Sequence, residues 1–190
     1  MTNTIKNIAV FASGGGSNAQ KIFEHFQHHT SVKVALVVCN KEGAHVIERA
    51  KKFGIPVLMI NKTFFQNEKE FLAALQPHKI DFIVLAGFLW LIPPYLIRAF
   101  PNKMVNIHPA LLPKYGGKGM HGHFVHEAIY KNKEKESGIS IHFVNEIYDS
   151  GEIIFQAKCA VEGLNPEEIA AEVLKLEHLH FAKEIEKLLC

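Results

Sequence analysis

The sequence has 190 residues, of which 48% are hydrophobic, so it can bury a core of its own and we expect a single domain over residues 1–190. Lysine and arginine total 21 against 19 for aspartate and glutamate, so no basic field favours a nucleic-acid partner. The three cysteines lack the C-x-x-C spacing of a zinc site, and no apolar segment reaches membrane length. We therefore expect a cytoplasmic protein without nucleic-acid or membrane partners.

Short β-branched runs alternate along the chain with segments of helical period. This alternation is typical of an α/β fold, doubly wound, with a mainly parallel sheet and helices on both faces. Ser17 or Asn18 is expected to cap the first helix, and Pro166 to lie in the first turn of another. Strands are predicted at 8–12, 34–39, 56–60, 82–85, 104–107, 139–143 and 153–158, and helices between the first two strands, at 44–53, 67–75 and 124–130, and from 166 onward.

Three consecutive glycines follow the first predicted strand. Because glycine lets a ligand approach the backbone, and the next helix begins with free amides, we expect a phosphate here. No Gly-Lys-Ser/Thr follows, which argues against a Walker loop. Gly14, Gly16 and Ala19 also fit a looser dinucleotide fingerprint. However, Cys39 and Asn40 stand where that fingerprint needs an acid, and a tight turn without a ligand is the other alternative.

Asn106 and His108 stand two residues apart at the end of a predicted strand, so their side chains point the same way. An amide beside an imidazole can stabilise the oxyanion of an acyl transfer. A nearby carboxylate would raise the pKa of the histidine and assist proton transfer, and Asp149 is the candidate. Spacing alone leaves two alternatives open: an ordinary turn aspartate before Ser-Gly, and a strand end with a satisfied histidine.

Taken together, these segments resemble the folate-dependent formyltransferase family, and within it the branch that acts on phosphoribosylglycinamide. The resemblance covers nearly the whole chain and includes an Asn-x-His-Pro-x-Leu-Leu-Pro run with a downstream His-Phe-Val and Asp-x-Gly. It implies a Rossmann-like fold and transfer of a formyl group from 10-formyltetrahydrofolate to the amine of phosphoribosylglycinamide in purine biosynthesis, without a metal. The stretches that carry it are 12–18, 84–88, 106–115, 138–143 and 149–151.

The resemblance also implies roles for individual residues. Asn106, His108 and Asp149 would be catalytic. The substrate would be held at its phosphate by Gly16, Ser17 and Asn18, and at its ribose and amino end by Glu177. The expected folate-binding residues are Leu89, Trp90, Leu91, Ile92, Asn106 and Asn145.

The chain departs from the family pattern in two places. Bacterial members carry basic residues where this chain has Trp90 and the Glu68-Lys69 segment, so we expect the folate glutamate tail to be held differently. The segment between Tyr115 and His126 is longer than in the family, which leaves the alignment of His121 and His123 open.

Three histidines at 121, 123 and 126 could be read as metal ligands, but no cysteine lies nearby, and we expect no metal. His142 precedes the Asp149 turn and is expected either to support Asp149 or to pack in its strand. Methionyl-tRNA formyltransferase and formyltetrahydrofolate deformylase share the chemistry, but each adds a domain for which 190 residues leave no room. A nucleotide-binding module without catalysis is the alternative from another class, and a homodimer is possible.

Overall fold

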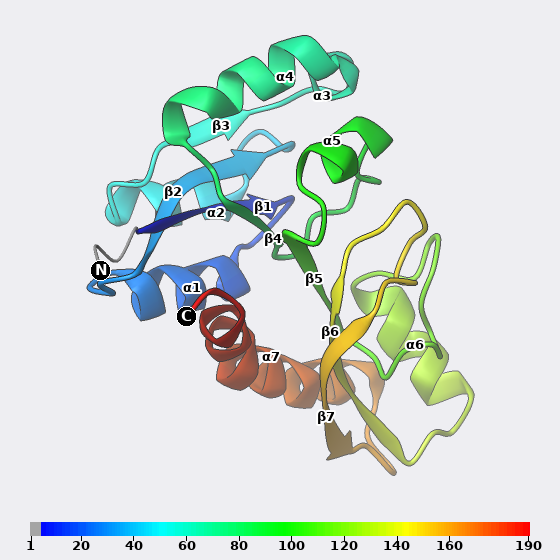
Figure 1. Cartoon of the computed structure of the whole chain (residues 1–190). Helices are drawn as coiled ribbons and strands as arrows, with labels where there is room; N and C mark the ends of the chain where they lie inside the picture. The colour runs from blue at the N-terminus through cyan, green and yellow to red at the C-terminus, as the bar shows by residue number, and fades with distance from the viewer. Residues whose placement is uncertain (1–4) are drawn as a thin grey trace.

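A computed structural model describes residues 5–190. Its centre is a seven-stranded sheet in the order β3-β2-β1-β4-β5-β6-β7 (Figure 1). The first five strands pair in parallel, whereas β6 and β7 join antiparallel. The sheet is therefore mainly parallel, as predicted. The strands are β1 (Lys6–Ala12), β2 (Val32–Cys39), β3 (Val57–Met59), β4 (Phe82–Leu85), β5 (Met104–His108), β6 (Glu136–Phe143) and β7 (Ile153–Ala160).

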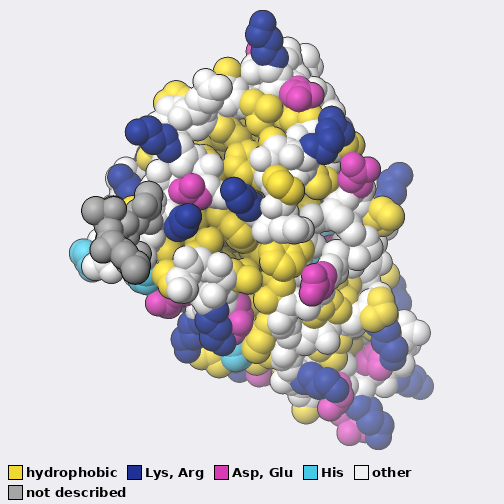
Figure 2. Space-filling model, in the orientation of Figure 1, with side chains coloured by type: hydrophobic (Ala, Val, Ile, Leu, Met, Phe, Trp, Pro, Cys, Tyr) yellow, Lys and Arg dark blue, Asp and Glu magenta, His cyan; other side chains and the backbone are white. Residues whose placement is uncertain are grey.

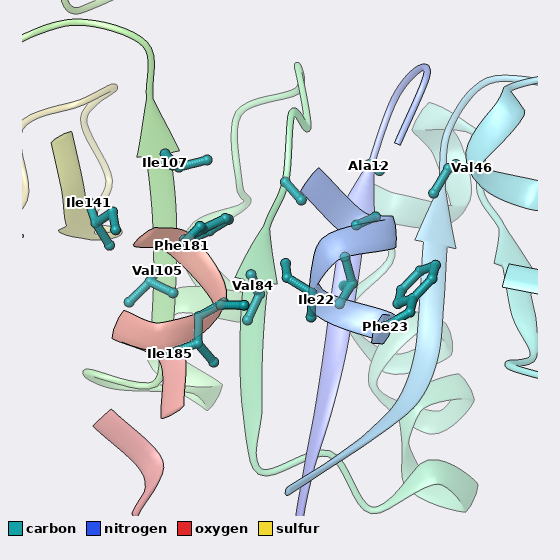
Figure 3. Packing of buried hydrophobic residues seen from close by; sticks show 14 of the residues in the cluster. Ala12, Ile22, Phe23, Val46, Val84, Val105, Ile107, Ile141, Phe181 and Ile185 are labelled. Atoms are coloured by element: carbon teal, nitrogen blue, oxygen red, sulfur yellow. The ribbon is translucent and has the colours of Figure 1, made fainter. Parts of the chain in front are cut away.

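Helices cover both faces of the sheet and enclose two hydrophobic clusters. One cluster contains buried residues of α1, α2, α6 and α7, and the other contains those of α3, α4 and α5. Figure 3 shows Ile22 of α1 and Phe181 and Ile185 of α7 beside Val84 and Val105 on the strands. The predicted doubly wound arrangement is confirmed. The helices are α1 (Ser17–Phe26), α2 (His45–Lys52), α3 (Lys62–Gln66), α4 (Glu68–Leu75), the 3₁₀ turn η1 (Gln76–His78), α5 (Pro94–Ala99), α6 (His123–Lys131) and α7 (Pro166–Leu189).

The start of α1 differs from the prediction that Ser17 or Asn18 caps it. The N-cap is Gly16, in the left-handed conformation with φ 70°, and no side chain caps the helix. Asn18 instead donates its side-chain amide to Glu177 of α7, so it is engaged elsewhere. The predicted place of Pro166 is confirmed, since it opens α7 behind an Asn165 capping box.

The order of the strands creates an edge suited to ligand binding. The chain winds outward from β1 through β2 to β3 and then returns to β4 on the other side of β1. In open α/β sheets, ligands bind beyond the carboxyl ends of the strands where the winding reverses. The glycine loop after β1 and the segment after β4 meet there, because Leu89 N donates to Ser13 Oγ at 2.9 Å.

The surface agrees with the near balance of charges in the sequence. On the face in Figure 2, lysine and arginine side chains are dispersed among acidic ones and apolar groups. Within residues 5–190, no helix is both long enough and apolar enough to cross a membrane.

Candidate active site

A cavity of about 580 Å³ opens at the carboxyl edge of the sheet. Its wall combines the ends of β4 and β5, the segment after β4, the loop before α6, the loop from Val144 to Asp149, and one face of α7. Segments distant in sequence thus converge on one volume. A cavity of this size suits a small organic ligand.

The structure brings Asn106, His108 and Asp149 together on the wall of this cavity. Asn106 Nδ2 donates to Asp149 Oδ1 at 3.4 Å, and His108 Nδ1 lies 3.5 Å from Asp149 Oδ2. The amide of Gly117 holds the same carboxylate by donating to Oδ2 at 2.9 Å. Asp149 itself has a positive φ of 52°. The loop therefore presents the carboxylate to both β5 side chains at once.

His142 contributes a second imidazole to this cluster. It faces Asn106 across the β5–β6 ladder, and its Nε2 lies 3.1 Å from Asn106 Nδ2 and 3.6 Å from Asp149 Oδ1. Its Nδ1 lies 2.8 Å from the Phe143 carbonyl oxygen and donates to it. Of the two expectations from the sequence, these contacts favour support of Asp149 over a histidine that only packs in its strand.

The pKa of His108 differs from the sequence-based expectation. His108 is only 3% exposed, and this burial lowers the pKa of its imidazole below the ordinary value. The Asp149 carboxylate and the Tyr115 carbonyl only partly oppose that effect. The prediction of a raised His108 pKa is therefore wrong, because desolvation of the cation outweighs its pairing with the carboxylate. Burial alone would raise the pKa of Asp149, but His142, His108 and the Gly117 amide together lower it.

Asn18 and Glu177 also line the cavity and contact each other. Glu177 is 9% exposed, and its Oε2 accepts a hydrogen bond of 2.6 Å from Asn18 Nδ2. Burial raises the pKa of this carboxyl group, and the Asn18 amide opposes the rise. Gly16 and Ser17 lie outside the cavity lining, directly before Asn18.

The predicted folate-binding residues all line the cavity: Leu89, Trp90, Leu91, Ile92, Asn106 and Asn145. The Trp90 ring packs on Phe65 and Phe88, with centroids 6.0 and 6.1 Å away. Among the described residues, the lining includes no lysine or arginine. An apolar wall of this kind can pack a flat heterocycle, with the polar groups at the end of β5 fixing its orientation.

The three histidines near α6 also lie on the cavity wall. Burial lowers the pKa of His126, and nearby His108 adds to the decrease. His121 and His123 are exposed and pack on the ring of Phe124, with centroid distances of 5.5 and 4.0 Å. Over the described part of the chain, no group of three or more histidine, cysteine or acidic side chains is arranged to hold a metal ion.

Two backbone groups of the site were not anticipated from the sequence. The Tyr115 carbonyl accepts from His108 Nε2 at 2.7 Å, and the Gly117 amide binds Asp149. Tyr115 has a positive φ of 58°. A Cβ on the neighbouring Gly116 would come within 2.6 Å of Leu112. The glycine pair after Tyr115 is the only sequence signal that pointed to this tight approach.

Comparison with known proteins agrees with this arrangement. The family model described as formyl transferase matches residues 6–185. The chain belongs to the formyl transferase family. It is 36% identical to the phosphoribosylglycinamide formyltransferase of Bacillus subtilis, over 97% of this chain and 95% of that protein.

Other formyl transferases extend the comparison. The chain is 44% identical to the chloroplastic phosphoribosylglycinamide formyltransferase of Arabidopsis thaliana over 91% of its own length, and spans 62% of that protein. The crystal structure of glycinamide ribonucleotide transformylase 1 from Geobacillus kaustophilus superposes with a TM-score of 0.88 at 35% identity, covering 98% of this chain and 100% of that one. The shared fold thus extends over nearly the whole chain.

Proposed function

We propose that this formyl transferase moves a formyl group from 10-formyltetrahydrofolate to the amine of phosphoribosylglycinamide in purine biosynthesis. The observation that carries the proposal is the grouping of Asn106, His108 and Asp149 on the wall of a cavity that Glu177 also lines. The names of the full-length relatives support the choice of substrate.

In the proposed reaction, the neutral amine attacks the formyl carbon, a C–N bond forms, and the carbonyl electrons move to oxygen. The Asn106 amide stabilises that oxyanion by exchanging its 3.4 Å hydrogen bond to Asp149 for one to the oxyanion, and His108 stabilises it through the positive charge of the imidazolium. Asp149, directly or through one water, moves the proton from the new ammonium group toward the folate nitrogen, which departs as the carbonyl re-forms.

The lowered pKa of His108 suits this proposal. Its ring nitrogens face a carbonyl at Nε2 and a carboxylate at Nδ1, so acceptors for a charged ring are already in place, while burial disfavours the charge before reaction. An oxyanion beside the ring would favour the imidazolium. The histidine would therefore bind the intermediate more strongly than the substrate, which is the difference that lowers a barrier.

The two substrates would occupy different walls. The pterin would pack on Leu89–Ile92 and the loop that contains Asn145. Glu177 and Asn18 would hold the ribose and amino end of the ribonucleotide, and the amides of Gly16 and Ser17, just outside the cavity, would reach its phosphate. Four further points stay predictions. They are a homodimer, a single domain, a cytoplasmic location, and a folate glutamate tail held differently from that in bacterial members of the family.

The test is formyl transfer by the purified chain, with phosphoribosylglycinamide, initiator methionyl-tRNA and water as competing acceptors. Transfer to the ribonucleotide is expected, and His108→Ala should lower turnover by about 10²- to 10³-fold, as for loss of one oxyanion donor. His28→Ala, at an exposed histidine outside the cavity, is the matched control. Transfer only to tRNA or water would contradict the proposal.

A further inference from the structure

Helix α2 holds two successive carbonyl groups of the glycine loop. Val46 N donates to the Gly14 carbonyl at 3.2 Å, and Arg49 Nε donates to the Gly15 carbonyl at 2.8 Å. The helix also lies close to the end of the loop, because a Cβ built on Gly16 would be 2.6 Å from Val46 Cβ. Helix α2 therefore holds the glycine loop from one side.

This grip determines where the loop amides point. The only cis peptide among the described residues is Leu112–Pro113, so the peptides of the glycine loop are trans. In a trans peptide, the carbonyl and the following N–H point in opposite directions. With the carbonyls of Gly14 and Gly15 turned to α2, the amides of Gly15 and Gly16 turn away from it.

Those amides are available to an anion. Within residues 5–190, the backbone N–H groups of Gly15, Gly16 and Ser17 have no hydrogen-bond partner. Successive amides that face one way form a concave site for anions, and the N-terminus of α1 adds to its positive potential. Gly15 is exposed, so a ligand can reach the loop.

Arg49 also brings positive charge to this side of the molecule. Burial lowers the pKa of His178, and the charges of Lys21 and Arg49 lower it further, which places both cations within electrostatic reach of the residue next to Glu177. The guanidinium therefore lies at the loop, where it contacts Gly15, and contributes positive charge on the side of His178.

We propose that Arg49 is a positioning residue for the substrate phosphate: by holding the Gly15 carbonyl, its guanidinium turns the Gly16 amide toward the phosphate. This inference rests on the proposed function, because it needs a phosphorylated substrate at the glycine loop. Arg49 acts through the loop backbone and takes no part in the chemical step.

The experiment compares Arg49→Gln, Arg49→Lys and the native chain, with Lys52→Gln as the matched control. Lys52 is an exposed cation of the same helix without a contact to the loop. Arg49→Gln should raise the KM for the ribonucleotide about tenfold, the effect expected when one charge-assisted hydrogen bond that orients the loop is lost. The kcat and the KM for the folate should stay unchanged. Arg49→Lys should restore much of the loss, and Lys52→Gln should have no effect.

A second measurement observes the loop directly. In ¹H–¹⁵N spectra of the native chain, the amide signals of Gly15 and Gly16 should shift when inorganic phosphate is added, and Arg49→Gln should weaken that response.

Three results would overturn the inference. An unchanged ribonucleotide KM in Arg49→Gln, with a native phosphate response, would overturn it alone. So would an equal rise of both KM values, which indicates general loss of structure. If the loop amide signals of the native chain do not shift with phosphate, and the native chain does not transfer a formyl group to the ribonucleotide, the proposed function is overturned, and the inference with it.

Discussion

At the scale of single residues, Asp149 connects the other groups of the reaction centre. It contacts an amide side chain, two imidazoles and one backbone N–H, and the two imidazoles and the N–H lower its pKa. Because Asn106 and His108 lie on a rigid strand, the loop that carries Asp149 sets the distance between the carboxylate and the imidazole. The strength of their coupling is therefore a property of that loop.

Replacing Asp149 by asparagine tests this coupling. The change should lower the already lowered pKa of His108 further, because the carboxylate beside the ring is lost. Turnover should fall by about 10²- to 10⁴-fold with little change in KM. NMR titration of His108 and single-turnover rates measure the two effects. Rate losses that multiply strictly in Asp149→Asn/His108→Ala, together with an unchanged titration, would reduce Asp149 to a turn residue.

Glu177 makes stability depend on pH. Because its pKa is raised in the folded chain, the folded state binds this proton more tightly than the unfolded state. The resulting stabilisation is complete below the unfolded pKa and is lost as pH rises through the folded value. Glu177→Gln should remove this loss and unfold at a higher denaturant concentration than the native chain at neutral pH, but not at pH 4. It should also raise the KM for the ribonucleotide. Parallel denaturation curves at every pH would contradict the first expectation.

At the scale of elements, Gly16 joins the phosphate loop to α1 in a conformation that other residues rarely adopt. Its φ of 70° is matched by the 67° of Gly43, but the surroundings differ. A Cβ on Gly43 meets nothing within 4 Å, whereas one on Gly16 would clash with Val46. The pair therefore separates backbone strain from steric conflict.

Gly16→Ala should accordingly destabilise the chain more than Gly43→Ala. Both carry the cost of a left-handed alanine, about 1 kcal/mol, and only the first must also push α2 away. Trimming Val46 to alanine should not rescue Gly16→Ala, because the Val46 Cβ and Cα, 2.6 and 2.9 Å from the new atom, remain. Chemical denaturation of the two single variants and Gly16→Ala/Val46→Ala measures this. Equal losses of unfolding free energy in Gly16→Ala and Gly43→Ala would show that the loop accommodates the added Cβ without a further energetic penalty.

The same elements show what local sequence can predict. The strand at Phe82–Leu85 was predicted with its observed bounds, because a buried parallel strand is a continuous apolar run. Helices α3 and α5, with five and six residues, were missed because they are too short to show a helical period. The cap of α1 was wrong because Asn18 is engaged by a residue distant in the chain.

The candidate site follows the same division. Asn106 and His108 could be predicted to share a face from their spacing on one strand. The lowered pKa of His108 could not, because burial depends on packing around the whole cavity. The carbonyl of Tyr115 and the amide of Gly117 are backbone groups without a residue-type signature.

At the scale of the whole molecule, α7 connects parts of the fold that are far apart in sequence. Its buried side chains belong to the same hydrophobic cluster as those of α1, α6, β5 and β6, and it also carries Glu177 into the cavity. Removing a large side chain from its buried face should therefore affect the fold as a unit.

Phe181→Ala should cost about 3–5 kcal/mol of unfolding free energy, the usual effect of deleting a buried aromatic ring. Phe181 is 1% exposed, whereas Leu179 on the same helix is 52% exposed. Leu179→Ala is the matched control, and its effect should stay within about 0.5 kcal/mol. Urea denaturation measures both. A small loss at Phe181 would mean that α7 packs loosely on the sheet.

The hydrogen bond between Asn18 and Glu177 joins residues 159 positions apart. A ribosome delivers Asn18 early, the β5 residues of the reaction centre much later, and Glu177 later still. A nascent chain can thus form the strands up to the one that carries Asn106 and His108 while the helix that carries Glu177 is still being translated. Ligands that need Glu177 as well as the β5 residues cannot stabilise such a chain, so substrate can protect the protein only once translation has passed α7.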